Sequence, residues 1–363
     1  MPSVFLVALL LMLLFSFIKH SSFGRLPSGD RLQRIRKSQQ YKDGQFRNHS
    51  HTPDLTDGAT YYKVLKEFIL GRSKRSKPIE ALPSKKQDLK SLANDSNTFV
   101  WFGHSSYFMK LDGKTFLVDP VLSGNASPVS FTTRSFAGSD RYTADDFPDI
   151  DYLLLTHDHW DHLDYKTLLA LQPKLKTIIT GLGTGEHLER WGFHPAIIIE
   201  NDWHDHQLLE EGFEIHATPA RHFSGRGLKR NQALWMSFVL KTPSMKIFIG
   251  GDSGYDTHFK TIGDLHGPFD LAILECGQYN AYWKHIHMMP EEVVQAAEDL
   301  RAKKFIPVHW AKFVLALHDW DDPILRVKKA AQEINLSALH PLIGELVNLN
   351  NPPTPIEWWK DVQ

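Results

Sequence analysis

The chain has little cysteine and no excess of charge of either sign. Cys276 is its single cysteine among 363 residues, which excludes an intramolecular disulfide and leaves packing and bound metal to supply stability. Lysine and arginine number 41 against 42 aspartates and glutamates, a formal net charge of −1. Such a balanced chain lacks the broad basic face that nucleic-acid binding uses, so we expect no nucleic-acid partner.

Short internal repeats of the solenoid or propeller type are also missing from the sequence. The composition is 42% apolar and 12% aromatic, which is enough to bury a sizeable core in one large α/β domain or in two small ones. Nothing in the sequence fixes the oligomeric state, and a homodimer is an open alternative.

The N-terminus carries an apolar run, VFLVALLLMLLFSFI, over residues 4–18. No basic residue precedes the run and no A-x-A cleavage pattern follows it, which argues against a removed signal peptide. Residues 1–20 are therefore predicted to be a membrane anchor or uncleaved signal. Basic residues follow the run, beginning with Lys19 and Arg25, and the positive-inside tendency then slightly favours a cytoplasmic catalytic domain.

Residues 21–96 are polar and basic and are interpreted as a linker and peripheral segment. Within them, apolar residues at helical spacing from Tyr61 to Ile69 predict one short amphipathic helix. We expect this helix to dock on the domain that follows. Basic residues from Arg72 to Lys86 are suited to attracting anionic lipid headgroups at a membrane surface.

Residues 97–363 alternate short β-rich runs with helical patterns. Strands are predicted over residues 98–103, 107–111, 115–119, 151–156, 233–240 and 246–252, and helices over residues 165–171, 184–191 and 290–301. Strands followed by helices, twice over, predict sheets covered by helices in an α/β sandwich.

One loop concentrates metal-ligand chemistry. The apolar run of residues 151–156 leads directly into His157-Asp-His-Trp-Asp-His162, an H-x-H-x-D-H cluster. Imidazole nitrogens and carboxylate oxygens suit zinc, and alternating side chains of one loop can reach two adjacent metal positions. His157, His159, Asp161 and His162 are therefore candidate ligands.

Three further apolar runs are each followed by a loop residue of a type that binds metal. They present His222, Asp252 and His309. Taken singly, a histidine there is more often structural, and Asp252 in GGDSG resembles a turn residue. Together they complete a set of seven ligands, enough for two zinc ions with one bridging residue and a shared water.

This order of motifs resembles the metallo-β-lactamase superfamily. More narrowly, the sequence is similar to the branch of phospholipases D that hydrolyse N-acylphosphatidylethanolamine. The similarity is carried by WFGHSSYFMKLDGKTFLVDPVLSGNASP, LLLTHDHWDHLDY, GGDSGYD, IGDLHGPFDLAIL, HMMPEEVV and IPVHWAKFVLALH. It implies an αββα sandwich for the catalytic domain.

The resemblance also implies how the ligands are shared between the metals. One zinc ion is expected on His157, His159 and His222. The other is expected on Asp161, His162 and His309, with Asp252 bridging the two. The same resemblance places His287 near the metals, where a structural histidine at the start of a helix is the alternative interpretation.

The expected reaction is hydrolysis of N-acylphosphatidylethanolamine, a phospholipid substrate, to an N-acylethanolamine and phosphatidic acid. Asp252 and Asp161 would position the attacking species, and His287 would protonate the leaving alcohol or bind a phosphate oxygen. Cys276 is expected to be packed and not to be a nucleophile. The loop 223–232 departs from what lipid-selective members are expected to have, and it borders the site.

Two other functions remain open from the sequence. The same metals would serve hydrolysis of a small soluble ester, lactone or cyclic phosphodiester. From a different class, the chain would be a non-catalytic, metal-dependent lipid-binding or scaffold protein. A lapsed enzyme usually shows broken ligands, and none of the seven is missing here.

Overall fold

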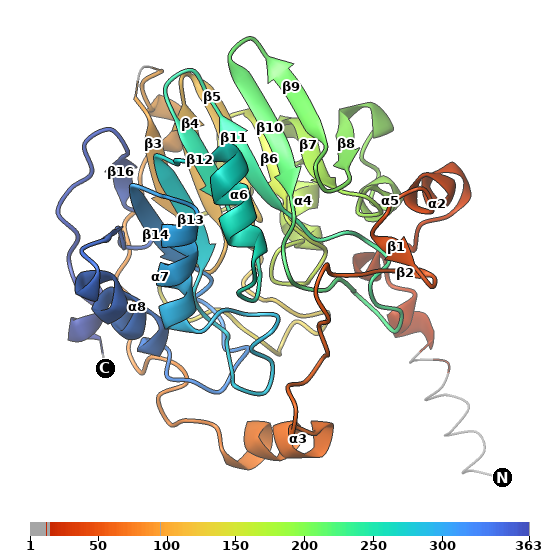
Figure 1. Cartoon of the computed structure of the whole chain (residues 1–363), viewed down its shortest axis with the longest axis horizontal. Helices are drawn as coiled ribbons and strands as arrows, with labels where there is room; N and C mark the ends of the chain where they lie inside the picture. The colour runs from red at the N-terminus through yellow and green to blue at the C-terminus, as the bar shows by residue number, and fades with distance from the viewer. Residues whose placement is uncertain (1–11, 13–14, 95, 363) are drawn as a thin grey trace.

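Two seven-stranded sheets pack face to face in the computed structural model, which describes residues 12, 15–94 and 96–362 (Figure 1). The strand order of the first sheet is β16-β3-β4-β5-β6-β7-β8, and that of the second is β15-β14-β13-β12-β11-β10-β9. Each sheet is antiparallel at one side and parallel at the other: β5 to β8 run parallel in the first, and β12 to β15 in the second.

The bounds of the strands and helices are as follows. The first sheet comprises β3 (Thr98–Trp101), β4 (Tyr107–Leu111), β5 (Lys114–Val118), β6 (Ile150–Leu155), β7 (Leu175–Gly181), β8 (Ile198–Asn201) and β16 (Leu346–Asn348). The second comprises β9 (His206–Glu210), β10 (Phe213–Thr218), β11 (Ser237–Lys241), β12 (Lys246–Ile249), β13 (Leu271–Glu275), β14 (Lys304–Val308) and β15 (Ser337–Ala338). The helices are α2 (Gly29–Ile35), α3 (Tyr61–Leu70), α4 (Tyr165–Leu171), α5 (Gly185–Arg190), α6 (His258–His266), α7 (Pro290–Asp299) and α8 (Asp322–Glu333), and β1 (Tyr41–Lys42) pairs with β2 (Gln45–Phe46) in a separate hairpin.

The central strands are buried on both faces. In β6, Leu153 and Leu155 point to the outer face and pack with the helices there, whereas Tyr152 and Leu154 join the core between the sheets. This alternation follows from the period of two along a strand. Strands buried on both faces read as continuous apolar runs, which is why residues 151–156 were recognisable as a strand in the sequence.

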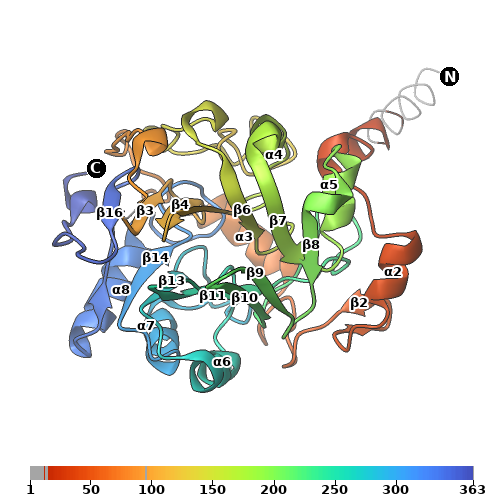
Figure 2. The ribbon, with the colours of Figure 1, turned by 90° about the horizontal axis from the view of Figure 1, so that it is seen from above.

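Helices cover the outer face of each sheet (Figure 2). α4 and α5 lie against the first sheet, with Leu168, Leu171 and Leu188 in its outer core. α6, α7 and α8 lie on the side of the second sheet, where Val293 and Val327 are buried. The four layers confirm the αββα sandwich expected from the resemblance.

One strand differs from its prediction. The apolar run 233–240 was expected to be a single strand, but β11 begins only at Ser237. Before it, Leu234 donates its backbone N–H to the carbonyl of Leu182, and Met236 to that of Thr156. The backbone N–H groups of these residues bond to carbonyls of the first sheet's loops and not to a neighbouring strand of the second sheet. The segment therefore connects the two sheets and does not extend β11.

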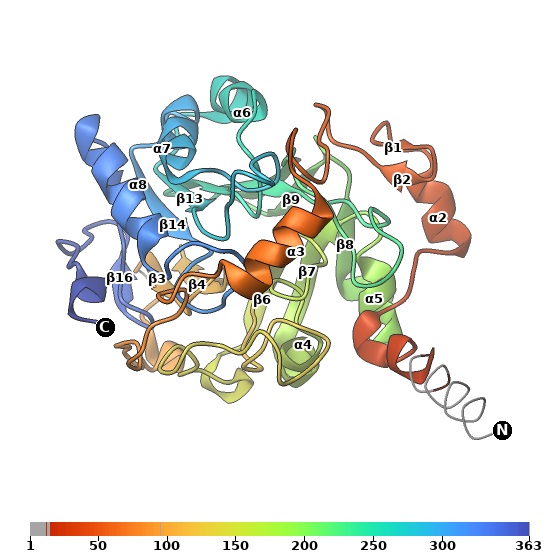
Figure 3. The same ribbon diagram turned by 90° about the horizontal axis from the view of Figure 1, so that it is seen from below.

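The segment 21–96 packs along the body of the sandwich. Arg31 of α2 forms ion pairs with Glu186 and Glu189 of α5 and with Glu200 of β8. Phe46 is fully buried in the main core. The predicted amphipathic helix is α3, which lies across one end of the sandwich (Figure 3). The boundaries 1–20, 21–96 and 97–363 stay a prediction as domain divisions.

The predicted membrane anchor is not supported. Among the described residues no helix is both long and apolar enough to cross a bilayer, and a crossing needs about 20 apolar residues. Most of the run 4–18 lies outside the described part. Its described end, Phe15 to Ile18, is helical and then turns at Lys19, whose N–H bonds back to the Phe15 carbonyl. The prediction of an N-terminal anchor, and of the orientation derived from it, is therefore wrong.

Candidate metal centre

The candidate ligands gather at one edge of the sandwich, where strands of both sheets end. β6 leads into the loop that starts with His157, and β10, β12 and β14 lead to His222, Asp252 and His309. Parallel strands place their carboxyl ends at one edge, where α/β folds commonly bind ligands. Residues far apart in the sequence are thereby brought together.

Three imidazoles form the first group. His157 Nε2 lies 2.9 Å from His159 Nδ1, and His222 Nε2 lies 3.2 Å from the same nitrogen. Ligands about 2.0–2.1 Å from a tetrahedral zinc ion are roughly 3.3 Å from one another. These two distances are of the size that one metal ion requires, and the ligand atoms of the group all lie within 4.8 Å of one another.

The second group contains Asp161, His162 and His309, with Asp252 between the groups. His162 Nε2 lies 3.7 Å from Asp161 Oδ2 and 3.2 Å from Asp252 Oδ2. Asp252 Oδ1 lies 3.2 Å from His309 Nδ1. On the other side, Asp252 Oδ2 is 3.7 Å from His222 Nε2, so this carboxylate contacts both groups.

Buried partners fix the orientation of the ligand rings. His162 Nδ1 is 2.8 Å from Asp119 Oδ2, His157 Nδ1 is 3.0 Å from the hydroxyl of Thr156, and His222 Nδ1 is 2.9 Å from the carbonyl of Ile286. In each case Nε2 is left facing the cluster. Metal-binding histidines are held in this way, by a hydrogen bond on the nitrogen that does not bind the metal.

Several buried polar atoms of the cluster have no hydrogen-bond partner. They are Nδ1 of His104, Nε2 of His159, His162 and His309, and Oδ1 of Asp252. Leaving such an atom unpaired costs about 1–3 kcal/mol, and their concentration in one place calls for a common partner. Imidazole and carboxylate donors without other partners fit a pair of divalent metal ions.

Burial keeps most imidazoles of the cluster neutral. Burial, together with the neighbouring imidazoles, lowers the pKa of His157, His222 and His309 well below the ordinary value. The pKa of His159 is lowered to about 4, again mainly by burial. A neutral imidazole offers the lone pair that a metal ion needs.

His162 is the exception. Burial lowers its pKa, but the carboxylates of Asp252, Asp161 and Asp119 outweigh burial and raise it well above the ordinary value. Burial raises the pKa of Asp252 to about 6. A divalent cation supplies the same positive charge to these carboxylates, so the imidazolium and a metal ion are alternative ways of balancing them.

His104 also belongs to the cluster, although the sequence interpretation did not single it out. Its Nε2 lies 2.9 Å from Asp161 Oδ2, and its ring centroid is 4.0 Å from that of His309. The side chain is fully buried. His104 follows the apolar run 98–102 in a loop, and this strand-end position, shared with the predicted ligands, was the signal that could have found it.

His287 lies at the edge of the cluster, as the resemblance implied. Its Nδ1 is 3.3 Å from Glu275 Oε2 and 4.0 Å from Asp252 Oδ2. Burial lowers its pKa, so the ring is neutral at pH 7. All eight predicted site residues are thus brought together. Their roles as ligands and catalysts stay predictions.

An open pocket of about 880 Å³ leads to the cluster. The loop 223–232 contributes Phe223, whose ring is 4.3 Å from that of His159, and Arg230, which lies over Phe223. Tyr61 and Phe68 of α3 line the same pocket. The loop that departs from the expected pattern therefore does border the site, beside α3, because Arg230 and Tyr61 both bond Asp54.

Comparison with known proteins identifies the family. Residues 114–310 match the family described as "Beta-lactamase superfamily domain". An uncharacterized protein of Mycobacterium tuberculosis is 34% identical over 328 residues, covering 89% of this chain and 88% of its own. The N-acyl-phosphatidylethanolamine-hydrolyzing phospholipase D 1 of Caenorhabditis elegans is 32% identical over 300 residues, covering 76% and 81%.

Solved structures show the same fold. The metallo hydrolase Igni18 of Ignicoccus hospitalis superposes with a TM-score of 0.54 at 20% identity, covering 69% of this chain and 97% of its own. The two-sheet sandwich, the strand-end cluster and the family match agree. The chain therefore belongs to the metallo-β-lactamase superfamily of metal-dependent hydrolases.

Proposed function

We propose that the protein is a zinc-dependent phosphodiesterase of the phospholipase D type, which hydrolyses N-acylphosphatidylethanolamine to an N-acylethanolamine and phosphatidic acid. The observation that carries the proposal is a histidine and aspartate cluster at the floor of an open pocket with an apolar wall. The Caenorhabditis elegans relative, whose name states this activity, supports the choice of substrate.

Two zinc ions fit the cluster better than one. Seven candidate ligands exceed what one tetrahedral zinc can use, and they divide into two groups around Asp252. His157, His159 and His222 would hold one ion. Asp161, His162 and His309 would hold the other, with His104 hydrogen-bonded to the Asp161 carboxylate.

The bound metal ions would activate the water, and residues of the chain would position the metal ions and the substrate. Two bound divalent ions lower the pKa of a shared water and stabilise negative charge on phosphoryl oxygens. Asp252 lies between the two ligand groups, so its carboxylate fixes their separation. Asp161 receives a hydrogen bond from His104, which directs its carboxylate into the pocket that would hold the phosphate.

His287 is placed to donate a hydrogen bond to a phosphate oxygen or, once it has taken up a proton, to protonate the leaving alcohol. Its Nδ1 is held by Glu275, so Nε2 is the atom available to substrate. Glu275 is itself held at its other oxygen by the Met288 N–H, at 3.0 Å. A ring fixed at one nitrogen presents the other in a constant direction, which general acid catalysis requires.

The rim of the pocket is suited to a lipid surface. On one side of α3, Phe68 stacks on Trp283 and lines the pocket. On the other side, Tyr62, Leu65 and Ile69 are exposed by 77%, 59% and 68%. Lys63 and Lys66 on the same helix add positive charge. An amphipathic helix of this kind lies in the interface of anionic membranes.

Two alternatives are kept as outcomes of the tests. Hydrolysis of a small soluble ester, lactone or cyclic phosphodiester would use the same cluster and leave the exposed face of α3 without a role. A non-catalytic, metal-dependent lipid-binding protein would use α3 and would need the cluster only to hold metal. A phospholipase requires α3 together with hydrolysis at the cluster.

The first experiment compares substrates. Purified, zinc-loaded protein is incubated with vesicles of N-acylphosphatidylethanolamine, with unacylated phospholipids and with a chromogenic phosphodiester, and the products are identified by mass spectrometry. We expect release of N-acylethanolamine, faster than any hydrolysis of the small compound. Cleavage of the small compound alone would contradict the lipid assignment, and no hydrolysis at all would contradict the enzyme.

The second experiment separates α3 from the chemistry. The double variant Leu65→Ser/Ile69→Ser should lower activity on vesicles by about tenfold and leave hydrolysis of a detergent-dispersed short-chain substrate within about twofold, because interfacial binding scales with buried apolar area. Leu325→Ser/Ile334→Ser, which changes exposed apolar residues in and just after α8, is the matched control. Equal activity of both double variants on vesicles would remove α3 from the proposal.

A further inference from the structure

A second group of metal-binding side chains lies on the outer face of the second sheet, away from the strand-end cluster. His206 of β9 and His216 of β10 are directly opposite each other in the antiparallel pair. Their rings are stacked, with centroids 4.3 Å apart and planes inclined by 17°. Glu214 precedes His216 by two positions, so the period of two along a strand places both side chains on one face.

One oxygen of the Glu214 carboxylate faces both imidazoles. Its Oε2 is 3.4 Å from His206 Nε2 and 3.9 Å from His216 Nε2. Its other oxygen, Oε1, is held by Lys241 Nζ at 3.0 Å. Lys241 lowers the pKa of Glu214, so this side chain is a carboxylate at neutral pH with Oε2 directed toward the two histidines.

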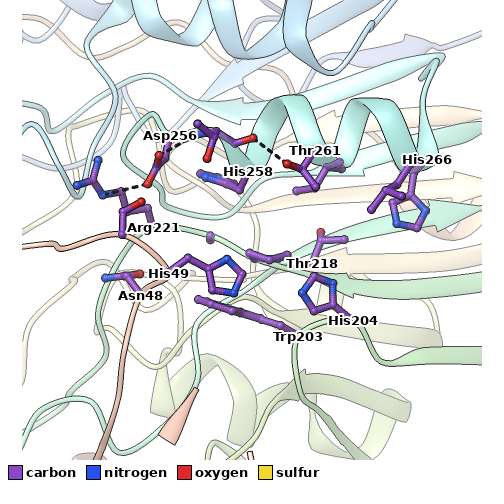
Figure 4. A pocket seen from close by; sticks show the side chains of 16 residues that line it. Asn48, His49, Trp203, His204, Thr218, Arg221, Asp256, His258, Thr261 and His266 are labelled. Atoms are coloured by element: carbon purple, nitrogen blue, oxygen red, sulfur yellow. Dashed lines mark hydrogen bonds and ion pairs between the residues drawn. The ribbon is translucent and has the colours of Figure 1, made fainter. Parts of the chain in front are cut away.

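More imidazoles surround the group. The ring of His266, the last residue of α6, is 4.8 Å from that of His216. Figure 4 shows His266, His204 and His49 around a neighbouring pocket between α6 and the chain that leads into β9. The rings of His49 and His204 are 6.2 Å apart. Five histidines therefore occupy one continuous part of the surface.

We propose that His206, Glu214 and His216 form a separate metal site, which takes a divalent transition-metal ion such as Zn²⁺ or Cu²⁺. We call these three residues the histidine face. The ligand atoms all lie within 4.8 Å of one another, and closing them to about 3.3 Å around an ion requires only side-chain rotation on a fixed strand pair. Two imidazoles and one carboxylate are a ligand set that zinc and copper accept.

A simple ion pair explains the arrangement less well. Both imidazoles face the same carboxylate oxygen, Glu214 Oε2, and the other oxygen of this carboxylate already pairs with Lys241, so a single carboxylate would have to serve three cations. Two stacked imidazoles also repel when both are protonated. A metal ion uses the lone pairs of both rings and the carboxylate at once.

Such an ion would hold an edge of the fold in place. β9 is the last strand of the second sheet, and edge strands have backbone groups paired on one side only. A metal bound to β9 and β10 adds a cross-link beside the end of α6. The proposal does not depend on the activity of the strand-end cluster, and each can fail without the other.

The test is a calorimetric titration of Zn²⁺ into the full-length protein. Before the titration, the strand-end cluster is loaded with zinc and the excess zinc is removed from the solution. We expect about one further equivalent per chain for the wild type. The double variant His206→Gln/His216→Gln should bind this equivalent at least about tenfold more weakly. His194→Gln, which removes an exposed histidine elsewhere, is the matched control and should bind like the wild type.

A spectroscopic readout keeps the test independent of folding defects. Cu²⁺ added to the zinc-loaded wild type should give an electron paramagnetic resonance signal with coupling to imidazole nitrogen. Glu214→Gln should keep this coupling and weaken binding severalfold, because it removes charge and leaves both imidazoles. Uptake by the double variant equal to that of the wild type, or no further equivalent in the wild type, would overturn the proposal.

Discussion

The strand-end cluster and the histidine face use the same side chains in opposite settings. In the cluster, His157, His162 and His222 are almost wholly buried, and a hydroxyl, a carboxylate and a carbonyl hold the ring nitrogens that face away from the site. On the histidine face, the side chain of His206 is 47% exposed and that of His216 is 26% exposed. Glu214, the carboxylate that faces these two rings, is itself 27% exposed.

This difference indicates what separates a catalytic metal centre from a surface one. Outer hydrogen bonds fix ring direction and raise ligand basicity, and a dry surrounding strengthens every charge interaction. The cluster has both features and is therefore suited to catalysis. The histidine face has a fixed strand pair and one carboxylate, which suffices for binding. Variants that remove one feature at a time test this comparison.

The largest effect is expected at the residue shared by the two ligand groups. Asp252→Ala should lower kcat/KM on N-acylphosphatidylethanolamine by more than about 100-fold, because it removes the carboxylate that we propose bridges the two metal ions. Circular dichroism should show a folded protein, and metal analysis should show less bound zinc. Asp264→Asn, an exposed carboxylate of α6, is the control. A fully active and fully metallated Asp252→Ala protein would refute the bridging role.

The next effect concerns a residue that contacts a candidate ligand on the ring nitrogen facing away from the cluster. Asp119 contacts His162 Nδ1 and accepts the Thr156 N–H at 2.9 Å. Asp119→Asn should lower activity at limiting zinc by about 10- to 100-fold, and excess zinc should restore part of it. The comparison is kcat/KM at two zinc concentrations. An identical loss at both would mean that Asp119 acts in folding and not on the metal.

A smaller effect is expected at Glu275. Burial raises the pKa of this residue well above the ordinary value, and its Oε2 lies 3.3 Å from His287 Nδ1. Glu275→Leu should lower kcat about tenfold with KM within about twofold, because the His287 ring loses the contact that orients it. Glu275→Gln, which keeps the shape and hydrogen bonding, should restore most of kcat. Equal loss in both variants would show that charge, not orientation, is what Glu275 provides.

The sequence was informative wherever ligands are local or end an apolar run. His157 to His162 stand in one loop, and their spacing alone indicated metal. His222 and His309 were recognisable because each follows a buried strand. His104 also follows an apolar run, but it was missed because its contact with Asp161 is made between residues far apart in the sequence. The outer carboxylates were missed for the same reason.

The fold, like the site, was predictable where the signal is local in the sequence. Continuous apolar runs marked the buried strands, whereas edge strands such as β9, which reads HQLLE and has neither a long apolar run nor strict alternation, carried little signal. The packing of residues 21–96 was not predictable at all. Asn48, for example, bonds both the N–H and the carbonyl of His222, a long-range contact that leaves no periodic pattern. The histidine face was equally invisible, because it depends on strand register.

The smallest effect is expected at Lys241, on the histidine face. Its ammonium group holds Glu214 Oε1 at 3.0 Å and offsets the charge that a metal ion needs. An exposed ion pair of this kind is worth about 0.2–1 kcal/mol, so Lys241→Gln should raise zinc affinity at this site by about one and a half to fivefold. Lys303→Gln, which removes an exposed lysine paired with Asp270, is the control. Zinc titrations of Lys241→Gln in low and high salt show whether charge causes the gain in affinity, because salt screens charge interactions and should reduce such a gain. A gain that persists in high salt would indicate altered packing of Glu214 and not a change in its charge interactions.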